Sequence, residues 1–397
     1  MSSLSDRINR LSESQTLAMT RKSRELTAQG IDVINLSIGE PDFDTPQFIK
    51  DAAKKAIDEN FSHYTPVPGY QDLREAISNK FKRDNNLDYS PDQIVVSTGA
   101  KQSIANVVLA LVNPGDEVLL PSPYWVSYYE IVKLAEGIPV PISSSIENDF
   151  KVTAAEIEEA ITDKTKLIIF STPCNPSGSV FSEEELKAIA DVVATHDELY
   201  IICDEIYEHI VFEGKHNSLA IFENVKDRVI TINGVSKGFA MTGWRIGYIG
   251  APDWIAKACT KIQGQFTSGA SSISQKAAVA AINMDPSCTT EMRNTFKQRR
   301  DLILDLLKEV DGLKTNIPEG AFYVFADISS YFNRSYDGTK IENATELTMY
   351  LLNEARVALV PGDAFGEANY MRISYACSDE VIRESIKRIK EALDKLK

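Results

Sequence analysis

Lys237 lies in the stretch TINGVSKGFAMTGWRIGY (231–248), closely flanked by Gly234 and Gly238 and followed eight positions later by Arg245. A fixed positive charge such as that of Arg245 disfavours protonation of a nearby ammonium and also suits a phosphate group. A lysine with a lowered pKa is a nucleophilic amine that forms Schiff bases with carbonyl compounds. The alternative is an ordinary surface lysine, because most lysines are exposed.

Asp204 is a second candidate, because it directly follows the apolar run 199–203. A carboxylate at the bottom of an apolar site is costly unless it is paired, so it needs a cationic partner. A helix N-cap is the alternative for this aspartate. Gly99, followed by Ala100 and Lys101, begins a helical pattern whose free N–H groups suit a phosphate. A plain strand-to-helix turn is the alternative there.

The elements that must position these residues are short β-rich runs alternating with helical patterns. The runs are IVVS (94–97), EVLL (117–120), LIIF (167–170), LYIIC (199–203), RVITI (228–232) and RIGYIG (245–250). They are typical of buried parallel strands. Ligands of such sheets bind outside the carboxyl ends of the strands. Five polar segments at those ends therefore predict one composite site, although any one of them alone could be an ordinary loop. The segments are 97–101, 121–125, 171–178, 204–207 and 233–238.

The stretch FSEEELKAIADVVATH (181–196) predicts a helix between two of the strands, because Ser182 and Glu185 have capping-box spacing. Alternating strands and helices predict an α/β domain over residues 45–285. The remainder, 1–44 and 286–397, has a long charged helical pattern and fewer strand candidates, so we expect a smaller α+β domain. Its strand candidates are AFYVFAD (321–327) and MRISYA (371–376).

Composition excludes several classes of protein. The chain has 397 residues, of which 43% are hydrophobic and 25% charged, and a net charge of −15. This charge opposes general binding to nucleic acid or to an anionic membrane. The five cysteines form no C-x-x-C pair, so the sequence gives no indication of a disulfide framework or of a metal site. Without an apolar signal or membrane-spanning run, we expect a cytoplasmic protein that acts on small molecules.

Five motifs resemble the class I aminotransferases that depend on pyridoxal 5'-phosphate (PLP), specifically the bacterial aspartate aminotransferase branch. The resemblance runs from about Leu4 to the last helix. It implies the fold type I of PLP-dependent transferases, with a mostly parallel seven-stranded sheet in the large domain, and a homodimer with shared active sites. The motifs are GEPDFDTP (39–46), YTPVPGYQDLREAI (64–77), NPSG (175–178), DEIY (204–207) and SKGFAMTGWRIGY (236–248).

The resemblance also assigns roles around the cofactor. Lys237 matches the lysine that holds PLP as a Schiff base and then shuttles the substrate's proton. Asp204 matches the partner of the pyridinium nitrogen, while Asn175 and Tyr207 match the pair at the phenolic oxygen. Trp125 matches the aromatic residue stacked on the ring, although a core tryptophan is the alternative reading.

Two further sets of positions follow from the same resemblance. Tyr64 matches a tyrosine that a neighbouring subunit lends to the cofactor phosphate. Arg372 matches the arginine that grips the α-carboxylate of the substrate, although a solvent-facing strand arginine fits the alternation equally well. The phosphate positions are Gly99, Ala100, Lys101, Ser236 and Arg245. The substrate positions are Gly39, Trp125, Asn175, Arg372, Lys101, Ser14 and Thr16.

The implied reaction is ping-pong transfer of an amino group from L-aspartate to 2-oxoglutarate. Lys101, Ser14 and Thr16 stand where this branch recognises a side-chain carboxylate. Relatives that use prephenate tend to carry a basic residue in place of Ser12 and a proline in place of Glu13, so we expect little prephenate activity. Alternatives are an aminotransferase of broader specificity, a PLP-dependent lyase and, outside enzymes, a ligand-sensing regulator.

Overall fold

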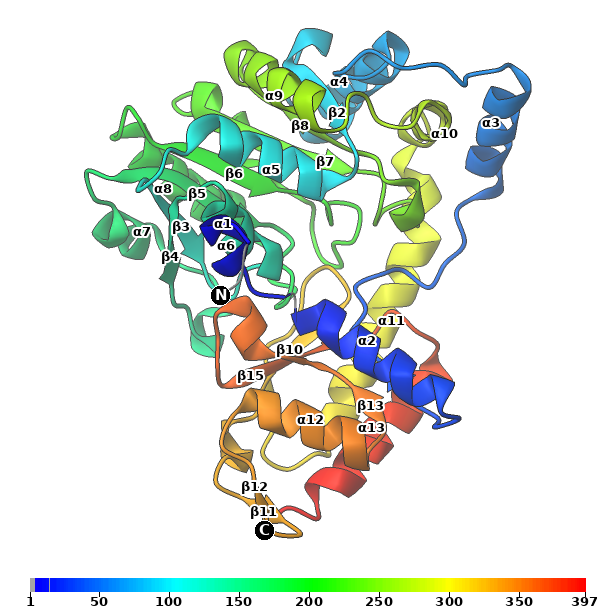
Figure 1. Ribbon diagram of the computed structural model, residues 1–397, viewed down its shortest axis with the longest axis vertical. Helices are drawn as coiled ribbons and strands as arrows, with labels where there is room; N and C mark the ends of the chain where they lie inside the picture. Colours follow the sequence, from blue (N-terminus) through cyan, green and yellow to red (C-terminus); the bar gives the residue numbers. More distant parts are fainter. Residues whose placement is uncertain (1–3, 14) are drawn as a thin grey trace.

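A seven-stranded sheet forms the centre of the larger part of the molecule (Figure 1). The computed structural model describes residues 4–13 and 15–397. The strands are parallel except β8, which confirms the predicted α/β class. Their order is β2 (Ile94–Ser97), β8 (Gly247–Gly250), β7 (Val229–Gly234), β6 (Tyr200–Asp204), β5 (Thr165–Ser171), β3 (Glu117–Pro121) and β4 (Ile138–Ile142).

Two expectations about this sheet were wrong or incomplete. The run 245–250 was predicted as a parallel strand, but β8 pairs antiparallel with both β2 and β7. The connection 235–246 holds only the 3₁₀ helix η5 (Thr242–Trp244) and no crossover α-helix, which a parallel return normally needs. Strand β4 was missed because its sequence, IPVPI, contains two prolines, which sheets tolerate mainly at an edge.

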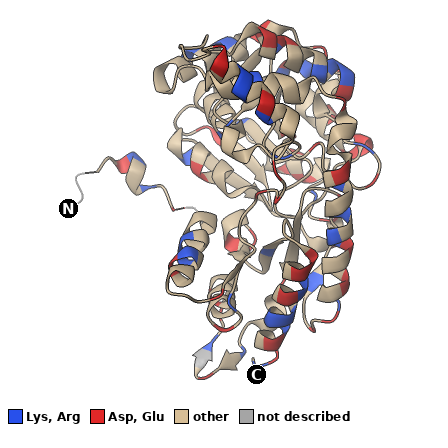
Figure 2. Ribbon diagram, turned by 90° about the vertical axis from the view of Figure 1, so that its right-hand side faces the viewer, with Lys and Arg blue, Asp and Glu red and all other residues tan. Residues whose placement is uncertain are grey.

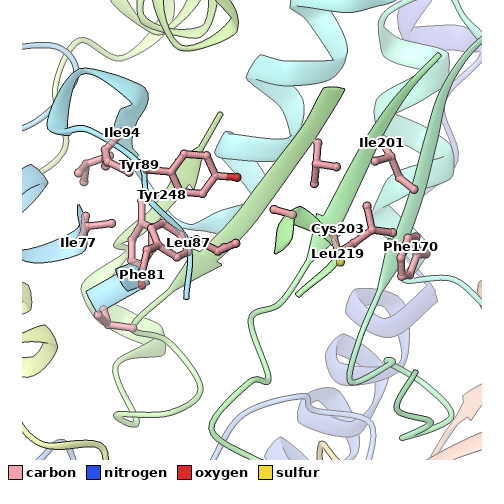
Figure 3. Packing of buried hydrophobic residues seen from close by; sticks show 14 of the residues in the cluster. Ile77, Phe81, Leu87, Tyr89, Ile94, Phe170, Ile201, Cys203, Leu219 and Tyr248 are labelled. Atoms are coloured by element: carbon pink, nitrogen blue, oxygen red, sulfur yellow. The ribbon is translucent and has the colours of Figure 1, made fainter. Parts of the chain in front are cut away.

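Helices cover both faces of the sheet, and alternate strand residues supply the two cores. Ile201 and Cys203 pack with Phe170 on one face (Figure 3), whereas Ile202 belongs to the core on the other face. The first core also contains residues of α3 (Gln47–Asp58), α4 (Gln71–Asn85), α7 (Ala154–Ala160), α8 (Glu183–Ala194) and α10 (Ser272–Ile282). The second contains residues of α5 (Ala100–Leu111), α6 (Val126–Leu134) and α9 (Asp253–Phe266).

The start of helix α8 shows how nearby residues in the sequence define where a helix begins. The side chain of Ser182 accepts a hydrogen bond from the Glu185 N–H, and the Glu185 carboxylate accepts one from the Ser182 N–H. This reciprocal pair satisfies two N–H groups that a helix start leaves unpaired. The capping box predicted from the sequence is therefore confirmed.

The smaller part of the molecule lies below the sheet in Figure 1 and has its own hydrophobic core. Its antiparallel sheet has the order β14 (Val360–Pro361), β15 (Tyr370–Ser374), β10 (Tyr323–Asp327) and β9 (Lys314–Thr315). Two strand pairs are β1 (Ile34–Asn35) with β13 (Val357–Ala358), and β11 (Ser335–Tyr336) with β12 (Thr339–Lys340). Its helices are α2 (Gln15–Ala28), α11 (Thr290–Leu307), α12 (Ala344–Glu354) and α13 (Asp379–Leu393), whereas the short helix α1 (Asp6–Asn9) lies beside α6 of the larger part (Figure 1). The two predicted strands at 321–327 and 371–376 correspond to β10 and β15, while the domain limits at 44/45 and 285/286 stay a prediction.

None of the helices in the described part of the chain combines the length and the apolar character needed to cross a bilayer.

Candidate active site

A cavity of about 320 Å³ opens where the carboxyl ends of the parallel strands meet the smaller part of the molecule. This volume suits a small ligand. The larger part contributes residues that directly follow β2, β3, β5, β6 and β7, and the smaller part contributes β10 and β15. Of the residues selected from the sequence, the cavity is lined by Thr16, Gly39, Ala100, Lys101, Trp125, Asn175, Asp204, Tyr207, Ser236, Lys237, Arg245 and Arg372.

Gly99, directly before α5, packs closely against the side chain of Arg245. Its φ is +83°, and a Cβ there would lie 2.3 Å from Nη2 of Arg245. Gly247 is equally constrained, since its Cβ would lie 2.1 Å from the Ala100 nitrogen. The first N–H groups of α5, at Ala100 and Lys101, have no backbone acceptor within the described residues. Free N–H groups at a helix start beside an arginine form a site for an anion.

Asp204 occupies the end of β6 and is 4% exposed. Its carboxylate accepts hydrogen bonds from the Tyr128 hydroxyl at 2.7 Å and from the Ile206 N–H at 3.2 Å. Burial raises the pKa of Asp204 to about 6, and these hydrogen bonds offset the rise only in part. Tyr128 was not selected from the sequence, because its contact with Asp204 joins α6 to a strand 76 residues away.

Lys237 follows β7, and its Nζ donates a hydrogen bond to the Gly39 carbonyl. The pKa of Lys237 is lowered to about 8, mainly by burial; Glu40 opposes this shift, whereas Arg372 and Arg245 add to it. The structure therefore supports a lowered lysine pKa, with burial rather than Arg245 as the main cause. At pH 7 to 8 a substantial fraction of this amine is neutral and can act as nucleophile or base.

Arg372 lies on β15 and is 2% exposed. Its Nη1 donates to Oδ1 of Asn175 at 2.9 Å and its Nη2 to the Ser37 carbonyl at 2.6 Å. Among the residues that the structure describes, none is a hydrogen-bond partner of its buried Nε. A buried guanidinium with a vacant donor is suited to a carboxylate ligand.

Lys101 and Trp125 lie together on another wall of the cavity. The ammonium of Lys101 is 4.9 Å from the centroid of the Trp125 ring. Burial lowers the pKa of Lys101, and Arg245 adds to this effect. A partly desolvated ammonium is a strong attractor for an anionic ligand group.

Three selected residues lie elsewhere. Gly99 shapes the cavity from behind rather than lining it. Tyr64 is 100% exposed and does not line the cavity of this chain. Ser14 lies outside the described residues. Conversely, Tyr323 lines the cavity although nothing in its local sequence, AFYVFAD, distinguished it from a core strand residue.

The charges on the cavity wall are mainly positive. The wall carries four cations, Lys101, Lys237, Arg245 and Arg372, and two carboxylates, Glu40 and Asp204. Within the described residues, no carboxylate lies within 4.0 Å of any of these four cations. Arg372 is buried, Lys237 is half-buried, and Lys101 and Arg245 are exposed. Four positive charges around one cavity attract ligands that carry several negative charges.

This chain is similar to a known protein family and to several named proteins. Residues 31–389 match the family model described as aminotransferase class I and II. A Petunia hybrida protein named bifunctional aspartate aminotransferase and glutamate/aspartate-prephenate aminotransferase is 49% identical over 100% of this chain and 84% of the relative. The aspartate/prephenate aminotransferase of Nitrosomonas europaea is 45% identical over 98% of this chain and 99% of the relative.

Solved structures agree with these relatives. The crystal structure of the aspartate aminotransferase from Rhizobium meliloti has a TM-score of 0.96 and 41% identity, with 100% of both chains covered. That of the Thermus thermophilus aspartate aminotransferase with maleate has a TM-score of 0.93 and 38% identity, covering 99% of this chain and 100% of that one. By its sequence, its fold and the residues around its cavity, this chain belongs to the class I and II aminotransferase family.

Proposed function

We propose that this protein transfers the amino group of L-aspartate to 2-oxoglutarate, which yields oxaloacetate and L-glutamate in two half-reactions at one site. The observation that carries the proposal is the set of four unpaired cations around one cavity, in a chain whose net charge is −15. Acidic and basic residues are otherwise interspersed over the outer helices (Figure 2). A phosphate and the carboxylates of a dicarboxylic substrate together supply the missing negative charge.

Aminotransferases of this family depend on PLP, and the residues of this cavity fit that cofactor. The N–H groups at Ala100 and Lys101, with Ser236 and Arg245, would hold the phosphate. The absence of side chains at Gly99 and Gly247 supports this assignment, because a Cβ at either position would collide with the wall of that anion site.

The remaining cofactor contacts are proposed on similar grounds. Asp204 would pair with the protonated ring nitrogen, which supplies the cation that this buried carboxylate lacks. Lys237 would bind the aldehyde through its amine. Tyr207 and Asn175 would contact the phenolic oxygen, and Trp125 would stack on the ring.

The chemistry divides between cofactor and protein. When bound, PLP supplies an electron-withdrawing ring that accepts the electron pair left on the substrate Cα after deprotonation. Once the amino group of the substrate has replaced it at the aldehyde carbon, the freed Lys237 amine would take the proton from the substrate Cα and donate a proton to the former aldehyde carbon. Its pKa of about 8 suits both steps near neutral pH. Arg372 orients the substrate by holding the α-carboxylate, while the Gly39 backbone closes the same end.

Lys101 and Thr16, which both line the cavity, would receive the side-chain carboxylate. The predicted third member, Ser14, stays a prediction. Two comparisons support a dicarboxylic substrate: the relatives are named for aspartate, and the Thermus thermophilus structure contains maleate, which is itself a dicarboxylate. Prephenate is a second candidate, because the Petunia hybrida and Nitrosomonas europaea relatives are also named for it.

A homodimer in a reducing, cytoplasmic environment completes the proposal. The Tyr64 side chain is fully exposed in a single chain, which fits a residue that reaches the phosphate of a second subunit. All five cysteines are free, as expected where disulfides do not persist. Sedimentation equilibrium should give twice the chain mass of 44.1 kDa, and a monomer would contradict the shared site.

The experiment that tests the proposed substrate is a rate panel with Lys101→Met. We expect the PLP-loaded wild type to use aspartate with 2-oxoglutarate and to change its visible absorbance reversibly with aspartate and then oxaloacetate. Lys101→Met should raise the KM for aspartate about 10- to 100-fold, the loss of one charge-assisted contact. The KM for alanine should change less than about twofold.

Lys261→Met is the matched control, because Lys261 is an exposed lysine on α9 outside the cavity. Equal losses for aspartate and alanine would refute the role of Lys101. Including prephenate in the panel decides between narrow and broader specificity.

A further inference from the structure

Tyr323 is a cavity residue to which neither the sequence motifs nor the proposed cofactor contacts assign a role. It begins β10, is fully buried and lines the cavity next to Tyr207 and Arg372. We infer that Tyr323 is a positioning residue: its hydroxyl turns the Tyr207 hydrogen toward the cofactor, and its ring holds Arg372 in place for the substrate. The inference rests on the proposed function.

The first half of the inference follows from counting hydrogens. The hydroxyls of Tyr207 and Tyr323 are 2.7 Å apart, and within the described residues no other hydrogen bond reaches either of them. A phenol has one hydrogen to donate and two lone pairs. If Tyr323 donates to Tyr207, the Tyr207 hydrogen is free to point at an anionic oxygen in the cavity. If Tyr207 donates to Tyr323, it has only lone pairs to offer to that oxygen.

A bound phenolic oxygen with negative charge therefore selects the first arrangement. Chains of hydrogen bonds polarise one another, so donation from Tyr323 also strengthens the bond that Tyr207 makes. The position of the Tyr323 hydroxyl is defined by Gly39, where a Cβ would lie 2.4 Å from that oxygen. Any larger residue at position 39 would displace the hydroxyl.

The second half concerns Arg372. Tyr323 pairs with Ser374 across the strands, so Arg372 is its diagonal neighbour on the same face of the sheet. The guanidinium carbon is 4.5 Å from the Tyr323 ring centroid and 5.0 Å from that of Phe365. Asn175 and Ser37 accept hydrogen bonds from its two terminal nitrogens. The guanidinium is therefore held by hydrogen bonds at its edge and by contact with two aromatic rings.

Two substitutions separate these contributions. Tyr323→Phe removes only the hydroxyl, whereas Tyr323→Leu also removes the ring. The readout for the hydroxyl is the midpoint pH of the change in visible absorbance that the PLP-loaded protein shows in the absence of substrate. The charged groups lining the cavity, Lys101, Lys237, Glu40, Asp204, Arg245 and Arg372, are the same in every variant.

We expect Tyr323→Phe to raise this midpoint by about half a pH unit, because weaker donation from Tyr207 stabilises the charged oxygen less. Tyr207→Phe should raise it more, and adding Tyr323→Phe to Tyr207→Phe should change nothing further. Tyr323→Leu should in addition raise the KM for aspartate about tenfold over Tyr323→Phe, with a smaller change in kcat. Tyr350→Phe, which removes a buried hydroxyl bonded to the Ala392 carbonyl, should leave all these values unchanged.

The outcomes distinguish the inference from the function on which it rests. If the wild type shows no pH-dependent visible absorbance with PLP, the proposed function fails. If the wild type and Tyr207→Phe behave as expected but Tyr323→Phe does not shift the midpoint, the role of the Tyr323 hydroxyl is refuted. An additive shift in the double variant would equally refute a path through Tyr207.

Discussion

Asp204, at the end of β6, and Glu208, in the turn that follows, are buried carboxylates whose environments shift their pKa values in opposite directions. Asp204 faces the cavity without a cationic partner, and burial raises its pKa to about 6. Burial alone would also raise the pKa of Glu208, but Lys80, together with His209 and His216, outweighs it and holds that pKa well below its usual range. Asn85 donates a further hydrogen bond to Glu208 at 2.8 Å.

The comparison separates structural charge from functional charge. Glu208 receives its cation from the fold, whereas Asp204 has a place for a cation that a ligand must bring. The neighbouring Glu205 also has partners within the fold: it accepts a hydrogen bond from the Ser218 hydroxyl at 2.6 Å, and Nε2 of His216 lies 3.0 Å from its other oxygen. Glu205, Glu208 and His216 bring ligand atoms within 4.8 Å of one another, but Lys80 already supplies the positive charge there. This cluster therefore anchors the back of the turn that presents Asp204.

The largest effect should come from Asp204→Ala. We expect kcat/KM for aspartate to fall at least about a thousandfold, which corresponds to about 4 kcal/mol of transition-state stabilisation. The free energy of unfolding of the cofactor-free protein in urea should change by less than about 2 kcal/mol, because removing a buried charge offsets the loss of the hydrogen bonds from Tyr128 and Ile206. Asp163→Ala, at an exposed position, is the control. Near-normal activity of Asp204→Ala would break the distinction between the two carboxylates.

Lys80→Met should have the next largest effect, this time on stability. Removing the cation leaves Glu208 buried and unpaired, and such a change costs about 3–5 kcal/mol. We expect the urea midpoint to fall accordingly, with much of the loss recovered in Lys80→Met/Glu208→Gln. A loss below about 1 kcal/mol in the single variant would show that the pair does not anchor the turn.

The smallest effect is a pair of opposite pH dependences in the cofactor-free protein. The folded state keeps the Asp204 proton up to about pH 6, whereas the unfolded chain releases it near 3.8. Stability contributed by this group is therefore present below pH 4 and falls by up to about 3 kcal/mol as the pH rises to 6. The contribution of Glu208 is present above its unfolded pKa of 4.5 and is lost as the pH falls toward its lower folded pKa.

Urea unfolding from pH 3 to pH 7 would measure both dependences. The difference between wild type and Asp204→Asn should shrink or reverse with rising pH, and that between wild type and Glu208→Gln should grow. Parallel curves would show that the two carboxylates are held alike.

Much of this arrangement could be predicted from the sequence because its signals are local. The capping box at Ser182 and the position of Asp204 directly after an apolar run depend on residues within a few positions of one another. The strand direction of β8 and the contacts of Tyr128 and Tyr323 depend instead on elements that meet only in the folded chain. Hydrophobic periodicity contains no information on such meetings, which is why these features were missed or wrong.

The antiparallel pairing of β8 with β2 determines how much of the chain must be synthesised before the cavity can form. Ser97 lies opposite Gly247, so the anion-holding end of the cavity is made from segments separated by more than a third of the chain. A nascent polypeptide that has not yet passed Gly247 already contains Asp204 but has only one wall of that pocket. The anion-holding end of the cavity is therefore complete only once both segments have been synthesised and paired.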